Sequence, residues 1–535
     1  MTQKAAVIGL DGSGWHLLDP LIEDGVMPRL DALRARGASG ILASTVPTYT
    51  PPAWTSAITG VNPGRHGVYG FVDGNVQSES KLMHAGRISA PTIWEMANEQ
   101  GASAGIYNVP LTYPPQALDG WMVSGMLTPG YGERRTGYTW PVELESDVES
   151  WEPGYLCDVS GNWEQDWRDD GLCRRVLTSL QQRVTVLDRL LDERPPDLLF
   201  AVLEAPDRLQ HVYYRYMDPS DELYDTPEGR RLRPAIAKCF AVMDRIVGLV
   251  DDFAGSDGGV VVCSDHGFTA WEFSVHTNTL LQQWGLLALK PGAGLMQTEA
   301  ARRIVPIAKR ILPAKVARRA KGQTFAAIDW AKTYAFASPI PQQGIYVNLA
   351  GREPNGIVPP AELQAMKENI AARFRALKDA EDRPLTDHVW LSEEVFHGEE
   401  LEGAPDVLPV LRDHRYELDD ELFHKEPLSD FRHLPRGAHH PDGIVAVAGR
   451  GVRSAGQLTG SVLDITPTLL YMADLEIPDG LDGRLLRDAF VPETFEERPP
   501  RSRAPLSSVH RDESSPYSED EEAQIEEALR GLGYI

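Results

Sequence analysis

Short apolar runs along this chain alternate with longer segments in which apolar residues recur at helical spacing. Such runs predict strands, and the helical spacing predicts helices. The predicted strands are residues 4–10, 40–44, 104–109, 121–124, 198–203, 260–264 and 444–448. The predicted helices include residues 27–36, 53–59, 173–193 and 235–253. This alternation predicts an α/β fold with a mainly parallel sheet.

Polar residues follow several of the predicted strands. Asp11 follows the first strand, Asp207 comes shortly after residues 198–203, and the pair Asp265 and His266 follows residues 260–264. In open α/β sheets, ligands bind at the carboxyl ends of the strands. We therefore expect these four side chains to lie near one another.

Residues 276–430 break the alternating pattern, and we interpret them as an insert or cap. A smaller α/β unit is predicted inside this region, with a strand at residues 344–349 and a helix at residues 360–377. Residues 1–275 and 431–490 then form the catalytic core. Residues 491–535 are rich in Pro, Ser and Arg and predict an extended tail, in which Ser518 and Glu521 form a capping box that opens a short helix.

Residues 302–321, inside the insert, hold eight Lys and Arg residues and no acidic residue. Three interpretations stay open: a solvated surface, a rim that draws an anionic substrate towards the core, and a patch that rests on anionic lipid. Pro306 and Pro313 interrupt any long helix here. We favour the rim over the membrane patch.

The charge and hydropathy of the chain argue against two classes of protein, those that bind nucleic acid and those that span a membrane. The 535 residues are 42% hydrophobic, which allows a sizeable core, and carry a formal net charge of −26. That charge argues against binding a nucleic acid polymer, which needs a basic face. No stretch approaches 18 apolar residues, and no signal peptide is recognisable, so we predict a cytoplasmic protein without membrane contact. The isolated cysteines predict buried apolar positions: Cys157, Cys173, Cys239 and Cys263.

Thr50 is a candidate nucleophile. Pro51 and Pro52 follow it and predict the first turn of a helix, where a phosphate group is favoured. A free threonine hydroxyl is a poor nucleophile, but coordination to a metal ion activates it at neutral pH. The alternative is that Thr50 merely caps the helix.

Three further motifs carry residues of the kinds that bind metals. Asp207 and His211 lie four residues apart and face the same way on a helix. Asp265 and His266 end a strand and precede a glycine. His439 precedes the strand at residues 444–448. The alternatives are a helix cap with a surface histidine, a polar turn and a polar hairpin, respectively. Together with Asp11 and Thr50, these residues make two mixed nitrogen and oxygen sets, which suit zinc, manganese or iron better than magnesium or calcium.

The order of these motifs resembles that of the alkaline phosphatase superfamily, above all its type I phosphodiesterase and nucleotide pyrophosphatase branch and the related predicted phosphohydrolases. The resemblance rests on Asp11-Gly12, the segment from Thr50 to Gly60, Pro206-Asp207 to His211, Asp265-His266-Gly267, Gly437-Ala438-His439, and Asp464 to Leu469. It implies a three-layer α/β sandwich with a mainly parallel central sheet and an inserted cap. It also implies that Asp11, Thr50, Asp265 and His266 hold one metal ion, and that Asp207, His211 and His439 hold the other.

The resemblance has one departure. Nucleotide pyrophosphatases place an asparagine that contacts the phosphoryl oxygens where this chain has Ala53. A sulfatase is disfavoured because residues 50–54 lack the Cys/Ser-x-Pro-x-Arg signature. A cofactor-independent phosphoglycerate mutase would carry a serine nucleophile.

We therefore predict an enzyme that uses two divalent ions, Zn²⁺ or Mn²⁺, and Thr50 to hydrolyse a small anionic phosphate ester. Monoester, diester, pyrophosphate and phosphonate substrates stay open. The alternative is a weakly active or non-catalytic protein of the same fold that binds metal or phosphoglycan.

Overall fold

The structure is a computed structural model of the chain. It describes residues 3–74, 77, 81–130, 137–162, 165–293, 325–338, 344–506, 511, 514–532 and 534. The basic stretch at residues 302–321 lies outside the described residues, so its role stays a prediction.

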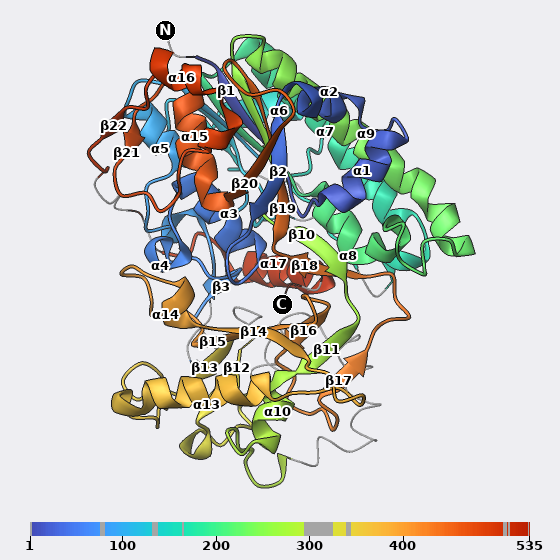
Figure 1. The fold of residues 1–535 in the computed structure, drawn as a ribbon, viewed down its shortest axis with the longest axis vertical. Helices are drawn as coiled ribbons and strands as arrows, with labels where there is room; N and C mark the ends of the chain where they lie inside the picture. The colour runs from blue at the N-terminus through green and yellow to red at the C-terminus, as the bar shows by residue number, and fades with distance from the viewer. Residues whose placement is uncertain are drawn as a thin grey trace.

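A nine-stranded sheet forms the centre of the larger part of the molecule, in the order β20-β2-β19-β9-β1-β8-β5-β6-β7 (Figure 1). Its strands are β1 (Ala5–Leu10), β2 (Ala38–Ala43), β5 (Ala104–Tyr107), β6 (Gly120–Val123), β7 (Thr139–Trp140), β8 (Leu198–Leu203), β9 (Gly259–Cys263), β19 (Asp442–Gly449) and β20 (Gly456–Ser461). The pairs β1–β8, β1–β9, β5–β8, β5–β6 and β2–β20 are parallel. Strand β19 is antiparallel to β2 and β9, and β7 is antiparallel to β6.

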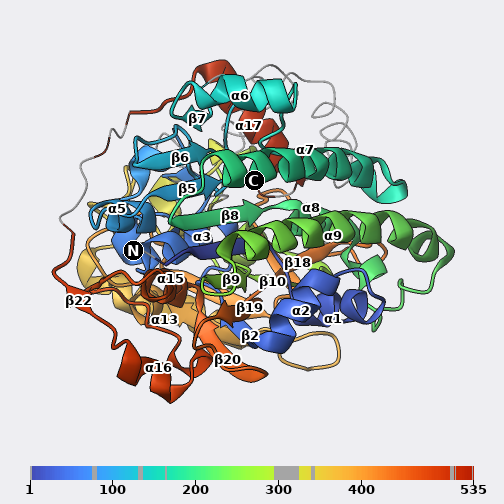
Figure 2. The same cartoon turned by 90° about the horizontal axis from the view of Figure 1, so that it is seen from above.

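Helices cover both faces of this sheet, as the view from above shows (Figure 2). One face packs on α1 (Trp15–Glu23), α2 (Pro28–Arg36), α6 (Leu144–Trp151), α7 (Gly171–Glu193), α8 (Ala205–Met217) and α9 (Pro227–Ala254). The other packs on α3 (Thr50–Thr59), α5 (Ile93–Asn98) and α15 (Ile465–Met472). Strand β1 is buried throughout because Val7 points into one core and Ile8 into the other. The predicted α/β sandwich is therefore confirmed.

A smaller part of the molecule lies below the carboxyl ends of the central strands (Figure 1). It holds an antiparallel sheet of β12 (Ala335–Ala337), β13 (Ile345–Val347), β15 (Val407–Leu411) and β14 (Thr386–Leu391), with α10 (Thr277–Gln283), α13 (Leu363–Arg375) and α14 (Ser392–Val395). Strands β16 (Tyr416–Asp419), β11 (Phe273–His276) and β17 (Leu428–Asp430) form a second sheet. These elements apart from α14 share a hydrophobic core of their own, and Val395 of α14 packs against a separate small cluster. The domain boundaries at residues 275 and 431 stay a prediction.

Two antiparallel strands, β10 (Gly267–Ala270) and β18 (Gly437–His440), form a ribbon that connects the smaller part to the central sheet. Shorter elements are α4 (Pro63–His66), α16 (Pro492–Glu497), β3 (Val72–Asp73), β4 (Lys81–Leu82), β21 (Ile477–Pro478) and β22 (Ser502–Arg503).

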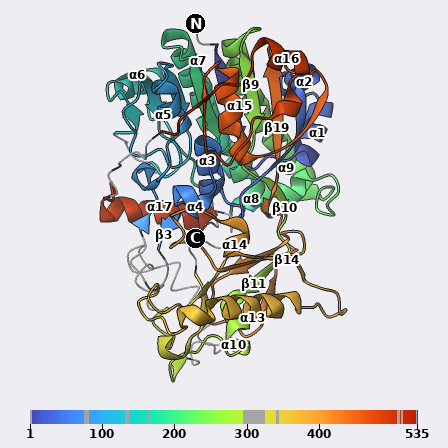
Figure 3. The ribbon, with the colours of Figure 1, turned by 60° about the vertical axis from the view of Figure 1, so that its left-hand side comes forward.

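The described residues after 490 include α16, β22 and the helix that the capping box predicts. The segment returns over the core and forms α17 (Glu519–Leu532), which begins at the predicted capping box: Ser518 N donates to Glu521 Oε2 at 2.8 Å. Buried Ile525 and Leu529 belong to the same core as α3 and α15. Figure 3 shows α17 near the level at which the two parts of the molecule meet.

Most predicted and observed elements differ by a few residues at their ends, but α9 begins at Pro227, eight residues before the predicted start at residue 235, and continues through Pro234. Helix α3 begins at Thr50 rather than at residue 53, because prolines are accepted in a first helical turn. The four cysteines are buried thiols. Within the described residues, no helix has both the length and the apolar character that crossing a membrane requires. The cytoplasmic location stays a prediction.

Candidate active site

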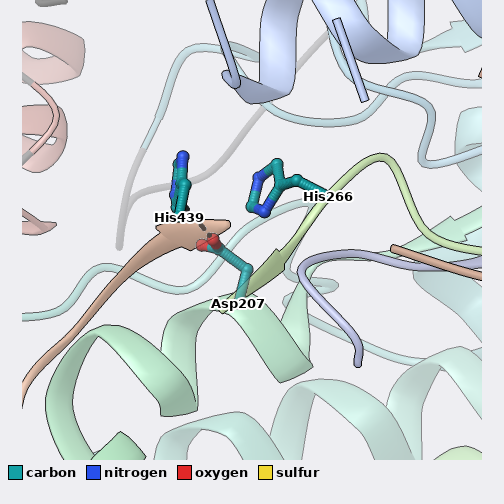
Figure 4. Close-up of side chains that lie close together, drawn as sticks. All are labelled: Asp207, His266 and His439. Atoms are coloured by element: carbon teal, nitrogen blue, oxygen red, sulfur yellow. Dashed lines mark ion pairs between the residues drawn. The ribbon is translucent and has the colours of Figure 1, made fainter. Parts of the chain in front are cut away.

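The seven residues singled out in the sequence come together at the carboxyl ends of β1, β8 and β9. They are Asp11, Thr50, Asp207, His211, Asp265, His266 and His439, and all seven are buried. Figure 4 shows how Asp207 from α8, His266 from the turn after β9 and His439 from β18 point at one another. The site thus lies where the topology of an open α/β sheet places a ligand.

Thr50 is the first residue of α3, and its side chain faces the turn after β9. Its Oγ1 lies 3.2 Å from His266 Nε2. His266 Nδ1 donates to the carbonyl of Gly267 at 3.1 Å, so Nε2 carries the lone pair and accepts from the Thr50 hydroxyl. Tyr49 is the N-cap residue of α3, which has no side-chain cap. The observed position therefore disfavours the interpretation of Thr50 as a plain helix cap.

Asp11, Asp265 and His266 form one group that could hold a cation. His266 Nε2 lies 3.2 Å from Asp265 Oδ2 and 3.8 Å from Asp11 Oδ1. The other oxygens are held by the protein: Gly12 N donates to Asp265 Oδ1 at 3.1 Å, and Trp54 Nε1 donates to Asp11 Oδ2 at 2.8 Å.

Gly12 is required by the geometry of that turn. It has a φ of 71°, and a Cβ there would approach the Phe268 ring to 2.6 Å.

Asp207, His266 and His439 form a second group, so His266 belongs to both. Asp207 Oδ1 lies 3.3 Å from His211 Nε2 and 3.4 Å from His439 Nε2, and the two Nε2 atoms are 3.0 Å apart. His211 follows Asp207 by one turn of α8, as the sequence spacing predicts. His439 Nδ1 donates to the carbonyl of Thr48 at 3.1 Å, which turns its Nε2 towards the centre.

Burial and mutual repulsion govern the charges of the carboxylates. Burial raises the pKa of Asp11 well above its usual range, and the charges of Asp265 and Asp207 raise it further. Burial likewise raises the pKa of Asp265 to about 7. Burial by itself would raise the pKa of Asp207, but His211, His439 and Arg208 hold it well below its usual range.

Among the imidazoles, burial lowers the pKa of His211 to about 4 and that of His266 well below its usual value. Burial also acts to lower the pKa of His439, but the neighbouring carboxylate of Asp207 raises that pKa overall. His211 and His266 are therefore neutral near pH 7 and present nitrogen lone pairs to the site.

The donor atoms fit divalent cations. Three buried carboxylate oxygens have no hydrogen-bond partner among the described residues, and these are Asp11 Oδ1, Asp207 Oδ1 and Asp265 Oδ2. They are the oxygens nearest the histidine Nε2 atoms. Buried, unpaired carboxylates that cluster with neutral imidazoles are stabilised by bound cations, which supply the missing positive charge.

Two other buried or half-buried histidines, His440 and His66, do not join the cluster. His440 is next to His439 but points to the opposite side of β18, where its Nε2 lies 3.3 Å from Asp413. His66 is fully buried away from the cluster: its Nδ1 accepts from Val68 N at 3.1 Å, and its Nε2 lies 2.9 Å from Ser56 Oγ. His66 therefore joins α3 to the turn after α4 and does not face the candidate cation groups.

Sequence reasoning missed three residues that hold the site together: Trp54, Arg208 and Tyr534. Arg208 Nη1 donates to Asp207 Oδ2 at 2.8 Å, and its Nη2 pairs with Asp158 at 3.0 Å. Trp54 and Arg208 lie within motifs that the sequence analysis identified, yet a motif does not show what its intervening side chains contact. Tyr534 carries no local signal, because it lies 327 residues from its partner Asp207.

Comparison with known proteins identifies the family. Residues 5–415 match the family described as type I phosphodiesterase / nucleotide pyrophosphatase. The chain belongs to this family. A search of curated protein sequences finds no significant match.

Several solved structures are similar to this phosphodiesterase family member, and the phosphonoacetate hydrolase shares its fold. The phosphonoacetate hydrolase of Sinorhizobium meliloti 1021, in complexes with phosphonoformate and with phosphonoacetate, superposes with TM-scores of 0.54 and 0.53 at 17% identity, covering 88% of this chain and 96% of that chain. The murine ectonucleotide pyrophosphatase / phosphodiesterase 5 gives a TM-score of 0.47 at 14% identity, covering 91% of this chain and 100% of that chain.

Membership of the family confirms the resemblance seen in the sequence. The chain is a metal-dependent hydrolase of phosphate esters with an alkaline phosphatase-like fold.

Proposed function

We propose that this enzyme hydrolyses a small anionic phosphate ester through Thr50 as the nucleophile, with two divalent ions, Zn²⁺ or Mn²⁺. The observation that carries the proposal is the position of Thr50: its buried Oγ1 lies 3.2 Å from His266 Nε2, at the edge of both candidate cation groups. A threonine hydroxyl in that position serves as a nucleophile once a cation lowers its pKa.

The residues divide between the two ions as the sequence resemblance implies. Asp11, Thr50, Asp265 and His266 would hold one ion, and Asp207, His211 and His439 the other. Mixed carboxylate and imidazole donors suit zinc or manganese. When bound, the ions would activate the hydroxyl and neutralise the charge on the phosphoryl oxygens.

In the proposed reaction, Thr50 Oγ forms a bond to phosphorus while the bond to the leaving oxygen breaks. The Thr50 proton leaves with the departing oxygen, which is released as an alcohol or phenol. Water then cleaves the Thr50–phosphorus ester bond, which releases phosphate from a monoester or a phosphate monoester from a diester and restores the hydroxyl. The start of α3 contributes little direct hydrogen bonding, because Pro51 and Pro52 have no backbone N–H and Ala53 N donates to the carbonyl of Tyr49. Ala53 also lacks a polar side chain, so neutralising the phosphoryl charge depends mainly on the cations.

We also propose that the smaller part of the molecule caps this site. Two hydrogen bonds and one ring contact join the smaller part to the core. Asn62 Nδ2 donates to the carbonyl of His397 at 3.0 Å, and Tyr69 Oη donates to the carbonyl of Glu400 at 2.8 Å. The ring of Phe396 also packs edge-on against Tyr69. Such a cap would limit the site to small substrates.

The test combines turnover with trapping of the intermediate. Protein stripped with EDTA is supplied with Mn²⁺ or Zn²⁺ and given an aryl phosphate monoester or diester. We expect turnover only with added metal. Acid quenching should leave a phosphoryl group on the peptide that contains Thr50, still esterified when the substrate is a diester, and mass spectrometry detects it.

Tight metal binding without turnover of any ester would instead support the non-catalytic alternative. Metal-dependent turnover with phosphate trapped on another residue would exclude Thr50 as the nucleophile.

A further inference from the structure

The segment after residue 490 is anchored to the core before it reaches the site. Arg511 Nη2 pairs with Glu95 Oε2 at 2.7 Å, and Tyr517 Oη donates to the carbonyl of Leu127 at 3.1 Å. Helix α17 then crosses towards the level at which the two parts of the molecule meet, and the end of the chain lies beside it (Figures 1 and 3). These contacts bring Tyr534, which follows α17, to the candidate active site.

Tyr534 is 1% exposed and is surrounded by residues of the site. Its ring packs edge-on against His211 with centroids 5.0 Å apart and lies 4.8 Å from the ring of Phe71. Its backbone carbonyl accepts a hydrogen bond of 3.1 Å from Tyr49 Oη. Contacts to both the ring and the backbone hold the side chain in one place.

The phenol of Tyr534 meets the carboxylate of Asp207. Tyr534 Oη donates to Asp207 Oδ2 and accepts from Arg208 Nη1 at 2.7 Å. Arg208 also donates to the same Oδ2, at 2.8 Å. Both protein donors therefore bind one oxygen of Asp207.

The other oxygen of Asp207 faces the histidines. Oδ1 lies 3.3 Å from His211 Nε2 and 3.4 Å from His439 Nε2. Two donors on Oδ2 fix the rotation of the carboxylate and leave Oδ1 as the atom that a cation can bind. Hydrogen-bonding partners behind a metal ligand orient it, and their loss commonly weakens metal affinity by about 10–100-fold.

We propose that Tyr534 is a positioning residue for Asp207, so that its phenol orients the carboxylate within the cation site of Asp207, His211 and His439. The inference rests on the proposed function, because it takes those three residues as ligands. Arg208 by itself would not suffice, because it also pairs with Asp158 and its charge is shared between two carboxylates.

The experiment compares Tyr534→Phe with Tyr517→Phe as a matched control. Both tyrosines are buried, both belong to the segment after residue 490, and both donate from the phenol, but Tyr517 donates to backbone carbonyls remote from Asp207. Metal-free full-length protein is titrated with Co²⁺, and the visible absorption spectrum follows each binding step. We expect Tyr534→Phe to weaken one of two steps by about 10–100-fold and to leave the other unchanged. Tyr517→Phe should alter neither step.

Equal Co²⁺ affinities in Tyr534→Phe and the wild type would overturn the inference, and so would a single weak step in the wild type. Equal weakening of both steps with a lower melting temperature would assign Tyr534 a merely structural role. Tyr534→Met, which also lacks the hydroxyl, replaces Tyr534→Phe if that variant fails to fold. Binding is measured without substrate, so two Co²⁺ ions bound without ester turnover would reject the proposed function and leave this inference standing.

Discussion

The indole Nε1 of Trp54 donates a hydrogen bond of 2.8 Å to Asp11 Oδ2, which joins helix α3 to the end of strand β1. The ring reaches this position by lying over Gly9, where a Cβ would approach Trp54 Cη2 to 2.3 Å. The glycine in the middle of β1 therefore leaves room for the residue that orients a proposed metal ligand.

Replacing Trp54 with Phe should weaken cation binding at the Asp11, Asp265 and His266 group. The variant keeps an aromatic ring but loses the N–H, so Asp11 is free to rotate. We expect metal affinity to fall by about 10–100-fold, measured by competition with a chelator. Trp94→Phe is a suitable control, because Trp94 is equally buried in the same core. An unchanged affinity in Trp54→Phe would show that Asp11 needs no support from α3.

Replacing Thr50 with Ala should lower kcat by at least about 10³-fold, because removal of a nucleophile leaves only binding and charge stabilisation. Thermal melting should be close to that of the wild type. Thr59→Ala controls for loss of a buried hydroxyl from the same helix, since Thr59 Oγ1 donates to the carbonyl of Thr55 within that helix. Near-normal kcat in Thr50→Ala would exclude the covalent route.

The adjacent residues His439 and His440 provide a paired test of the second cation group. His439→Ala should lower the metal content by about one ion per chain, because the group loses a nitrogen donor. His440→Ala should keep the full content, because its side chain lies on the opposite side of β18 near Asp413. Elemental analysis of both purified variants gives the answer, and equal metal contents would contradict the assignment of His439.

His66 should make the protein sensitive to acid. Burial lowers its pKa to about 3, whereas an unfolded histidine titrates near 6.5. Between these pH values the unfolded chain binds more protons than the folded protein. The stabilisation that the neutral, buried His66 gives the folded state is therefore fully present above pH 6.5 and is lost as the pH falls. The loss amounts to about 2–3 kcal/mol at pH 4.5.

We therefore expect the melting temperature of the wild type to fall more than that of His66→Gln as the pH is lowered from 7 to about 4.5. His433→Gln, at an exposed position, controls for the loss of any histidine. A difference that is constant with pH would show that His66 does not stay neutral in the folded protein.

The sequence by itself determined the features that depend on neighbouring residues. Apolar periodicity predicted the strands of the central sheet and the helices that pack on it. Side chains point in the same direction at a regular interval that differs between strands and helices, so the pattern depends on each element alone. The spacing of Asp207 and His211 predicted that they share one face of a helix, and the structure places them 3.3 Å apart. The resemblance in motif order added the prediction that Thr50 and the remaining candidates join Asp207 and His211 in one site.

Only the tertiary structure decided the contacts between distant segments. The register of β18 on β10, with His439 opposite Phe268, shows that His439 faces the site and His440 does not. The pairing of Trp54 with Asp11 depends on how α3 packs against β1, and that of Tyr534 with Asp207 on the path of the chain after residue 490. Contacts of this kind leave no periodic signal, because they depend on the packing of whole elements rather than on the local backbone.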